Sequence, residues 1–145
     1  MAFQLGVICG GPSLERGISL NSARTLLDHF SGPNIHIRPF YIDRDLNPYA
    51  LDAHQLYSNT PSDFDFKLQK VSQVLDRESF IKELAQCDLI FPCIHGEFGE
   101  TGDLQALLES ANLPFVGSSS TSCKSFFLKH QAAVTLMQNG FRTIP

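Results

Sequence analysis

The sequence predicts an α/β fold: a doubly wound, open parallel sheet with helices on both faces. Short apolar runs of strand length alternate along the chain with segments whose apolar residues recur at helical spacing. Turn-forming residues separate them, for example Gly10-Gly11-Pro12 and Ser31-Gly32-Pro33-Asn34. Alternation of this kind is typical of a parallel sheet whose strands are connected by helices.

The first half of the chain contains two predicted strands with a helix between them. The apolar run at residues 3–9 predicts a buried strand, and residues 35–42 alternate enough to form a second one. The intervening helix is predicted to begin after Ser19, as its N-cap. Its apolar face comprises Leu20, Ala23, Leu26, Leu27 and Phe30. Residues 43–76, which we call the excursion, have a weaker hydrophobic periodicity, and we expect them to hold short strands or a hairpin.

The second half continues the alternation. Residues 77–87 predict a short helix, residues 89–94 a third buried strand and residues 113–117 a short fourth strand. A helix capped by Thr101 is predicted before the fourth strand. Residues 118–140 predict helical structure in two pieces. The apolar face of the helix at residues 77–87 comprises Phe80, Ile81 and Leu84. That of the helix after Thr101 comprises Leu104, Leu107, Leu108 and Ala111.

Composition and charge narrow the class of protein. With 145 residues, of which 43% are hydrophobic, the chain is long enough for one domain with its own core. A formal net charge of -4 leaves no basic face for nucleic acid or an anionic membrane. Its longest apolar runs, about six residues, are far shorter than the roughly 20 needed to span a bilayer. The start of the sequence lacks a basic segment and a cleavage signal, which predicts a cytoplasmic protein rather than a secreted one.

The four cysteines agree with a cytoplasmic location. Cys9, Cys87, Cys93 and Cys123 form no C-x-x-C pair, and Cys9 and Cys93 lie inside predicted strands. Small buried thiols are ordinary in such positions. We therefore expect reduced cysteines, and neither a disulfide framework nor a metal site.

Two loops carry the chemically active side chains, and each follows a predicted strand. Segment 95–103, with the sequence HGEFGETGD, follows the third strand and leads into a helix, whereas segment 10–16, GGPSLER, follows the first strand. Ligands of open α/β sheets bind outside the carboxyl ends of the strands, so both loops are expected at one edge of the sheet. His95, Ser13 and Glu15 are therefore candidate site residues.

Each of these residues also has a purely structural interpretation. A Gly-Gly pair after a first strand is often a plain turn, and it does not match the G-x-G-x-x-G fingerprint of dinucleotide binding. Glu15 would stabilise a helix N-terminus, and His95 would hydrogen-bond neighbouring backbone. Glu97 and Glu100 are predicted to be solvated, or to lie near a helix N-terminus, rather than to be catalytic. The position of His95 after a buried strand, in a loop with three glycines, favours a functional role.

Three motifs, in order along the chain, resemble the N-terminal domain of D-alanine–D-alanine ligases. They are Gly10-Gly11-x-Ser13-x-Glu15 with Ser19-Leu20-Asn21-Ser22, His95-Gly96-x-x-Gly99-Glu100-x-Gly102-x-Leu104-Gln105, and Leu113-Pro114-Phe115-Val116-Gly117-Ser118. The likeness covers nearly the whole chain, and the excursion resembles the longer branch of that family. It implies a Rossmann-like, pre-ATP-grasp domain at residues 1–140. Residues 141–145 would then begin a linker to a missing ATP-grasp domain.

The resemblance implies an ATP-dependent ligase that joins two D-alanines for peptidoglycan. ATP and Mg²⁺ would serve the full-length enzyme, and none is expected on this chain alone. Glu15 falls on the carboxylate that holds the ammonium of the first D-alanine, with Ser13 as a supporting hydroxyl. His95 falls on the histidine beside that D-alanine, and Gly96 and Gly99 keep this wall of the site close to the substrate.

The resemblance further implies a role for Lys129 and a set of partners. Lys129 falls on the lysine that reaches towards the ATP phosphates, although an exposed helix lysine is its structural interpretation. The partners are D-alanine, the missing ATP-grasp domains and, because members commonly pair through this domain, a second copy in a homodimer. Leu128 stands where the family usually has aspartate, which removes the expected cap of the following helix.

Two other functions compete with the ligase. One is a stand-alone, non-catalytic module that binds a small amino acid or a protein partner. The other is the matching domain of a different ATP-grasp ligase. The presence of both Glu15 and His95 favours the D-alanine–D-alanine ligase. Because residues 143–145 resemble the start of an extended segment, we expect the chain to be one domain of a longer enzyme.

Overall fold

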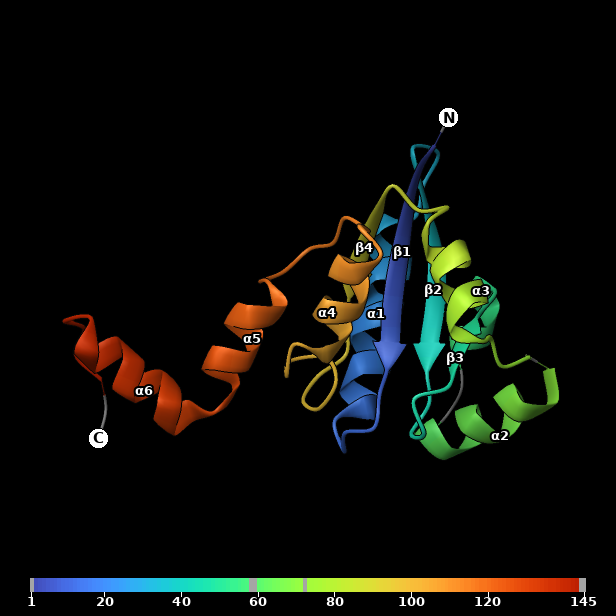
Figure 1. The fold of residues 1–145 in the computed structure, drawn as a ribbon. Coiled ribbons are helices and arrows are strands. Elements are labelled where there is room, and N and C mark those ends of the chain that lie inside the picture. The colour runs from blue at the N-terminus through green and yellow to red at the C-terminus, as the bar shows by residue number, and fades with distance from the viewer. Residues whose placement is uncertain (1, 58–59, 72, 144–145) are drawn as a thin grey trace.

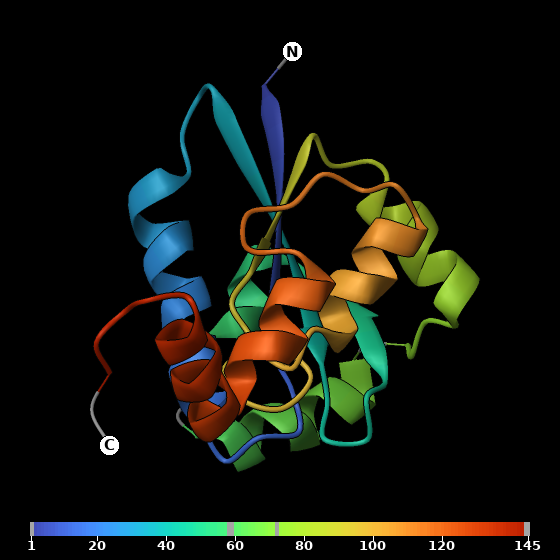
Figure 2. The same ribbon diagram turned by 60° about the vertical axis from the view of Figure 1, so that its left-hand side comes forward.

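A central sheet with helices on both faces forms the body of the protein, as the sequence predicts (Figures 1 and 2). The structure is a computed structural model that describes residues 2–57, 60–71 and 73–143. In Figure 1, α1 lies behind the sheet, and α3 and α4 lie in front of it. The end of the predicted linker, residues 144–145, lies outside the described residues.

The sheet has the strand order β3-β2-β1-β4 and is mostly parallel. The central strand β1, Phe3–Gly10, pairs in parallel with β2, Ile35–Ile42, and with β4, Leu89–Pro92. The short strand β3, Pro48–Ala50, is antiparallel to β2. The excursion therefore begins with a hairpin, one of the two forms expected for it.

The predicted strand at residues 113–117 is reduced to a single parallel bridge between Ile90 and Phe115. Ile90 N–H donates to the Pro114 carbonyl and Val116 N–H donates to the Ile90 carbonyl, at 2.9 Å each. Pro114 has no N–H with which to extend a ladder. The segment therefore lies beside β4, as expected, without forming a named strand.

Residues of β1 divide between two hydrophobic clusters because successive side chains of a strand point to opposite faces. Val7 and Cys9 are fully buried with Leu20, Ala23 and Leu27 of α1, Arg16–Phe30. Ile8 faces the other cluster, which α3, Arg77–Leu84, and α4, Asp103–Ser110, cover. That second cluster comprises Ile8, Phe40, Ile42, Phe80, Leu84, Cys87, Ile90, Ile94, Leu104 and Leu108.

Helix α1 begins earlier than predicted, whereas it ends at Phe30, directly before the predicted turn at residues 31–34. It begins at Arg16, and Glu15 is its N-cap residue, so the predicted cap at Ser19 is wrong. Ser19 is instead fully buried inside the helix, where its Oγ accepts a hydrogen bond from the Gly10 N–H at 2.8 Å. Phe30, the last residue of the helix, is 55% exposed because this turn extends past the buried stripe.

Beyond the hairpin, the excursion contains the 3-10 helix η1, Ala53–Leu56, and the helix α2, Pro61–Val71, which the sequence analysis did not predict. Phe64 and Leu68 of α2 are buried in the cluster on the α1 side of the sheet. The Phe64 ring packs on Tyr41, with 4.6 Å between the ring centroids. The excursion therefore contributes to the core.

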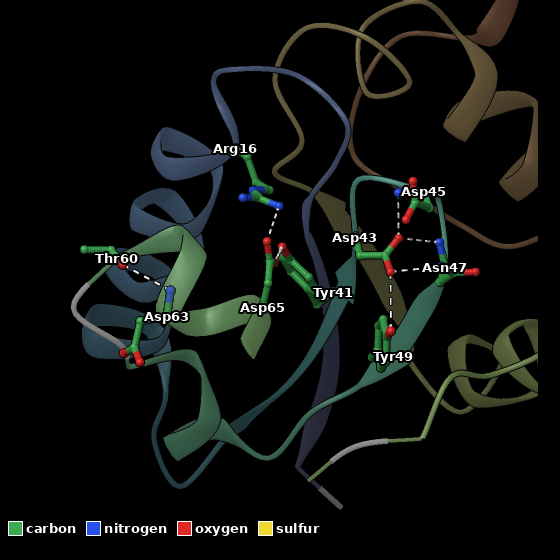
Figure 3. Close-up of polar contacts among 9 residues, drawn as sticks. All are labelled: Arg16, Tyr41, Asp43, Asp45, Asn47, Tyr49, Thr60, Asp63 and Asp65. Carbon is green, nitrogen blue, oxygen red and sulfur yellow. Dashed lines mark hydrogen bonds and ion pairs between the residues drawn. The ribbon is translucent and has the colours of Figure 1, made fainter. Parts of the chain in front are cut away.

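Two polar side chains shape the connections around the hairpin and α3. The Asp43 carboxylate accepts the N–H groups of Asp45 and Asn47, each at 2.8 Å, and so closes the turn between β2 and β3 (Figure 3). Asp76 caps α3 by accepting the Ser79 N–H at 2.7 Å. This hydrogen bond is the main reason why the pKa of Asp76 lies below its usual value.

Helix α4 begins after Gly102, which holds the N-cap position in a left-handed conformation. The predicted cap at Thr101 is therefore wrong. The Thr101 hydroxyl donates to Asp103 Oδ2 at 2.6 Å instead of accepting a backbone N–H, because the chain makes one more tight step at Gly102 before the helix starts.

The C-terminal segment forms α5, Ser120–Phe127, and α6, Lys129–Gln138, in agreement with the prediction of two helical pieces. Both helices extend away from the sheet (Figure 1). Leu128 is the N-cap residue of α6 and makes no side-chain cap, as expected from the absence of aspartate there. Large apolar side chains are exposed along and after these helices: Phe126, Phe127, Leu128, Met137 and Phe141.

Candidate active site

The two loops that carry the candidate residues meet at the carboxyl-end edge of the sheet. Gly96, in the loop after β4, has a φ of +71°, a conformation that L side chains rarely adopt. A Cβ atom at Gly96 would lie 2.7 Å from Ser13 Oγ and 3.2 Å from Glu15 Oε2. Ser13 and Glu15 therefore lie directly against Gly96, and His95 is the next residue. The structure brings together the groups that the sequence placed at this edge.

Backbone hydrogen bonds hold the loop after β1 in a fixed shape. The Gly11 N–H donates to the Ile42 carbonyl at 2.7 Å, which joins the start of the loop to the end of β2. The Glu15 N–H donates to Ser13 Oγ at 3.1 Å. Because its carbonyl also accepts from Ile18 and Ser19, Glu15 is fixed at the first turn of α1 while its side chain stays exposed. An exposed carboxylate on a fixed backbone is suited to binding a cation.

His95 lies between its own loop and α1. Its Nε2 is 3.4 Å from Ser22 Oγ, within hydrogen-bond distance. Its Nδ1 is 3.8 Å from Glu100 Oε1, and these two groups form an ion pair when the imidazole is protonated. The side chain is 38% exposed, so the ring is oriented by α1 and remains accessible. Ser22, which the sequence analysis quoted without a role, is thus a direct neighbour of His95.

Gly99 and Gln105 determine the shape of the loop after β4. A Cβ at Gly99 would lie 2.2 Å from the Ile94 carbonyl oxygen, so only glycine fits this buried position. Gln105, buried in α4, donates from Nε2 to the Gly99 carbonyl at 2.7 Å. The Ile94 backbone thus occupies the space beside the Gly99 Cα atom, and the Gln105 side chain lies at the Gly99 carbonyl.

Lys129 is not brought to this junction. It is exposed at the first position of α6, which extends beyond α5 on the side away from α3 (Figure 1). Among the described residues, no hydrogen bond or ion pair joins Lys129 to Glu15 or His95.

A buried ion pair next to Glu15 was not predicted from the sequence. Arg16 is only 4% exposed, and its Nη1 lies 2.6 Å from Asp65 Oδ2 of α2 (Figure 3). The Tyr41 hydroxyl donates to the other oxygen of Asp65 at 2.6 Å. Burial and this hydrogen bond raise the pKa of Tyr41 far above its usual range. In the sequence, Arg16 ends the predicted loop 10–16, and no local pattern connects it to Asp65.

The described residues contain no group of three or more histidine, cysteine or acidic side chains that could hold a metal ion. None of the described helices combines the length and apolar character that a membrane-spanning helix needs. The junction offers a carboxylate, a hydroxyl and an imidazole. Together these groups can bind a small ligand that carries both a positive and a negative charge.

Comparison with known proteins identifies the relatives of the chain. A family model described as the N-terminus of D-ala D-ala ligase matches residues 4–118. A D-alanine–D-alanine ligase from Oceanobacillus iheyensis is 32% identical over 130 residues, which covers 82% of this chain and 36% of the relative. The chain thus spans little more than a third of that enzyme.

Solved structures share the fold of the chain. The D-alanine-D-alanine ligase from Coxiella burnetii superposes with a TM-score of 0.79 at 23% identity, covering 99% of this chain and 43% of that one. The VanG D-Ala:D-Ser ligase from Enterococcus faecalis gives a TM-score of 0.79 at 25% identity, covering 100% of this chain and 44% of that one. In both cases the shared region is less than half of the solved protein.

Proposed function

The chain belongs to the family of D-alanine–D-alanine ligase N-terminal domains, and from this premise we propose that it is the substrate-binding domain of an ATP-dependent D-alanine–D-alanine ligase. The observation that carries the proposal is the junction of the two loops, where Gly96 lies against Ser13 and Glu15 and beside His95. In the complete enzyme, ATP would phosphorylate the carboxylate of one D-alanine. The amine of a second would attack the acyl phosphate, releasing phosphate and the dipeptide for peptidoglycan.

In this proposal Glu15 holds the ammonium of the first D-alanine. The Glu15 carboxylate is exposed, whereas its backbone is fixed by the first turn of α1. A hydrogen bond between two charged groups is shorter and stronger than one between neutral groups. Ser13, whose Oγ already accepts the Glu15 N–H, supports the geometry of this carboxylate.

His95 is proposed to act on the other end of the same substrate. Its imidazole is accessible and is oriented by Ser22 of α1. A donor held at this position can stabilise the carboxylate as charge changes during acyl transfer. Gly96, without a side chain, keeps the wall open between His95 and Glu15, and Gly99 keeps the loop folded tightly behind it.

ATP and Mg²⁺ are assigned in this proposal to the part of the ligase that the chain does not span. The described residues offer no cluster of metal ligands, and the relatives are more than twice as long as the region matched here. Lys129 would reach the ATP phosphates only from the border with that part. The exposed apolar side chains of α5 and α6 are suited to packing against it, since large exposed apolar patches mark interaction surfaces. Residues 141–145 would begin the linker.

The experiment that tests the function uses the full-length protein. Purified protein with Mg²⁺-ATP and D-alanine is expected to release one phosphate for each D-alanyl-D-alanine formed, and none with L-alanine. D-serine and D-lactate are supplied as alternative second substrates. Binding of D-alanine in calorimetry without any ADP formation would indicate the non-catalytic module instead. Turnover of an unrelated acid and amine would indicate another ATP-grasp ligase.

A further inference from the structure

Building on the proposed function, we propose that Asp65 is a positioning residue for the substrate loop. Through the buried guanidinium of Arg16, it holds the first turn of α1 in place, and with it the carboxylate of Glu15. Asp65 belongs to α2, which lies in the excursion at residues 43–76, and none of the three quoted motifs includes residues of this excursion. The excursion would then have a part in binding the first D-alanine.

The contacts of Asp65 are directed inward. One carboxylate oxygen is 2.6 Å from Arg16 Nη1, and the other accepts the Tyr41 hydroxyl at 2.6 Å (Figure 3). Nη1 has no hydrogen-bond partner of good geometry among the described residues, so its contact with Asp65 is an ion pair held by charge. Arg16 is 4% exposed and Asp65 28% exposed, so solvent screens the pair only weakly.

Further contacts attach the excursion along α1. Arg24 Nε donates to the Leu56 carbonyl at 2.7 Å, and the Tyr57 hydroxyl donates to the Asp28 carboxylate. These contacts lie further along α1, towards its C-terminal end. Among the hydrogen bonds and ion pairs described here between the excursion and α1, the pair with Asp65 is the one at the end of the helix where Glu15 lies. It therefore has the most direct influence on the substrate loop.

Two physical effects connect Asp65 to Glu15. First, the Arg16 N–H donates to the Ser13 carbonyl at 3.2 Å, so a fixed Arg16 also fixes the loop that carries Ser13 and Glu15. A loop that is ordered before binding costs less free energy to order when the ligand binds. Second, Asp65 neutralises the guanidinium next to Glu15 in the chain. Without Asp65, the buried guanidinium would carry an unpaired charge, which is strongly unfavourable and would favour displacement of Arg16 from this position.

The test uses Asp65→Asn in the full-length ligase, with Asp63→Asn as the matched control. The control removes a carboxylate from the same helix, where Asp63 pairs with the exposed Lys67 at 2.7 Å. We expect Asp65→Asn to raise the KM for the first D-alanine at least about threefold, because the loop must then be ordered on binding. The kcat and the KM for ATP should stay within about twofold of wild type, as should all constants of the control.

The split between KM and kcat distinguishes positioning from a general structural role. A variant that is only partly folded would lose kcat in proportion to the active fraction and keep its KM. An unchanged KM for D-alanine in Asp65→Asn therefore overturns the inference. If Asp65→Asn does not fold, Tyr41→Phe removes a single hydrogen bond from the same carboxylate and should raise the KM in the same direction, and an unchanged KM in that variant overturns it too. Failure of the wild-type enzyme to form the dipeptide would overturn the proposed function itself.

Discussion

Glu15 and Gly96 come from different loops, and a Cβ added at Gly96 would lie only 3.2 Å from Glu15 Oε2. The contact joins the carboxyl ends of β1 and β4, which are neighbours in the sheet. It places the Glu15 carboxylate of one loop beside Gly96 of the other loop. Because His95 precedes Gly96 in the chain, His95 lies at the same edge of the sheet. The next three predictions depend on this junction.

Glu15→Gln in the full-length enzyme should weaken binding of the first D-alanine about ten- to a hundredfold. The substitution replaces a charged partner of the ammonium with a neutral one, and a hydrogen bond to a charged group typically contributes about 1.5–3 kcal/mol. Calorimetric titration with D-alanine measures the change. Glu78→Gln, on the exposed outer face of α3, is the matched control and should leave the affinity unchanged. Wild-type affinity in Glu15→Gln would contradict the assignment.

His95→Gln should lower kcat more than it raises the KM for D-alanine, because the imidazole is proposed to stabilise charge that develops during the reaction. Ser22→Ala removes the hydroxyl 3.4 Å from His95 Nε2 and should have a smaller effect in the same direction. Steady-state kinetics in both substrates, with a thermal melt of each variant, provide the test. If His95→Gln keeps full turnover, or melts far below wild type, the histidine is idle or structural.

Gly96→Ala should both destabilise the protein and raise the KM for D-alanine. The left-handed backbone costs an alanine roughly 1–2 kcal/mol, and its methyl group would press against Ser13 and Glu15. Gly32→Ala is the control, because a Cβ at Gly32 meets no atom within 4 Å. Urea unfolding and kinetics of both variants are compared with wild type. Equal stability and KM in the two variants would show that the junction is looser than described.

The buried cysteines should make stability fall at alkaline pH. Burial raises the pKa of Cys93 to about 12 and that of Cys9 even further, whereas a thiol in the unfolded chain ionises near pH 8.5. The contribution of these buried, protonated thiols to the free energy of unfolding is therefore complete below about pH 8.5. It is lost as the pH rises towards 12. The urea midpoint should be lower at pH 10 than at pH 7.

The same burial predicts selective labelling of thiols. In the native protein at pH 8, Cys123, which is partly exposed, should react first with a thiol reagent, whereas Cys9, Cys87 and Cys93 are buried and should react slowly. All four should react at similar rates in urea. Mass spectrometry of digested samples identifies the labelled positions. Rapid labelling of Cys93 in the native state would contradict its burial.

The 145-residue chain by itself should release no phosphate from Mg²⁺-ATP in the presence of D-alanine. Phosphoryl transfer needs metal ions and positive groups around the transferred phosphate, and the described residues contain no metal-ligand cluster. A colorimetric phosphate assay, with the full-length enzyme as positive control, measures this. Phosphate release in proportion to dipeptide from the short chain would overturn the assignment of ATP to the remaining domains.

Local patterns in the sequence predicted most of the sheet. Residues 35–42 form β2 as predicted, and β1 differs from its prediction only by including Gly10. β1 was readily predicted because a strand buried on both faces is a nearly continuous apolar run that turn residues interrupt, whereas β2 was predicted from its alternation. Helix α2 was missed. Its buried Phe64 and Leu68 are one helical turn apart, but polar residues surround them and their apolar partners lie elsewhere in the chain.

The sequence by itself determined which loops carry a carboxylate, a hydroxyl and an imidazole, and at which edge of a parallel sheet they lie. Only the tertiary structure decided their neighbours. It set Gly96 against Glu15, placed Ser22 beside His95, and buried Ser19 where a helix cap was predicted. It also joined Arg16 to Asp65. Periodicity and turn residues report on the few residues around them, whereas these contacts depend on how helices and strands that are distant in the chain pack together.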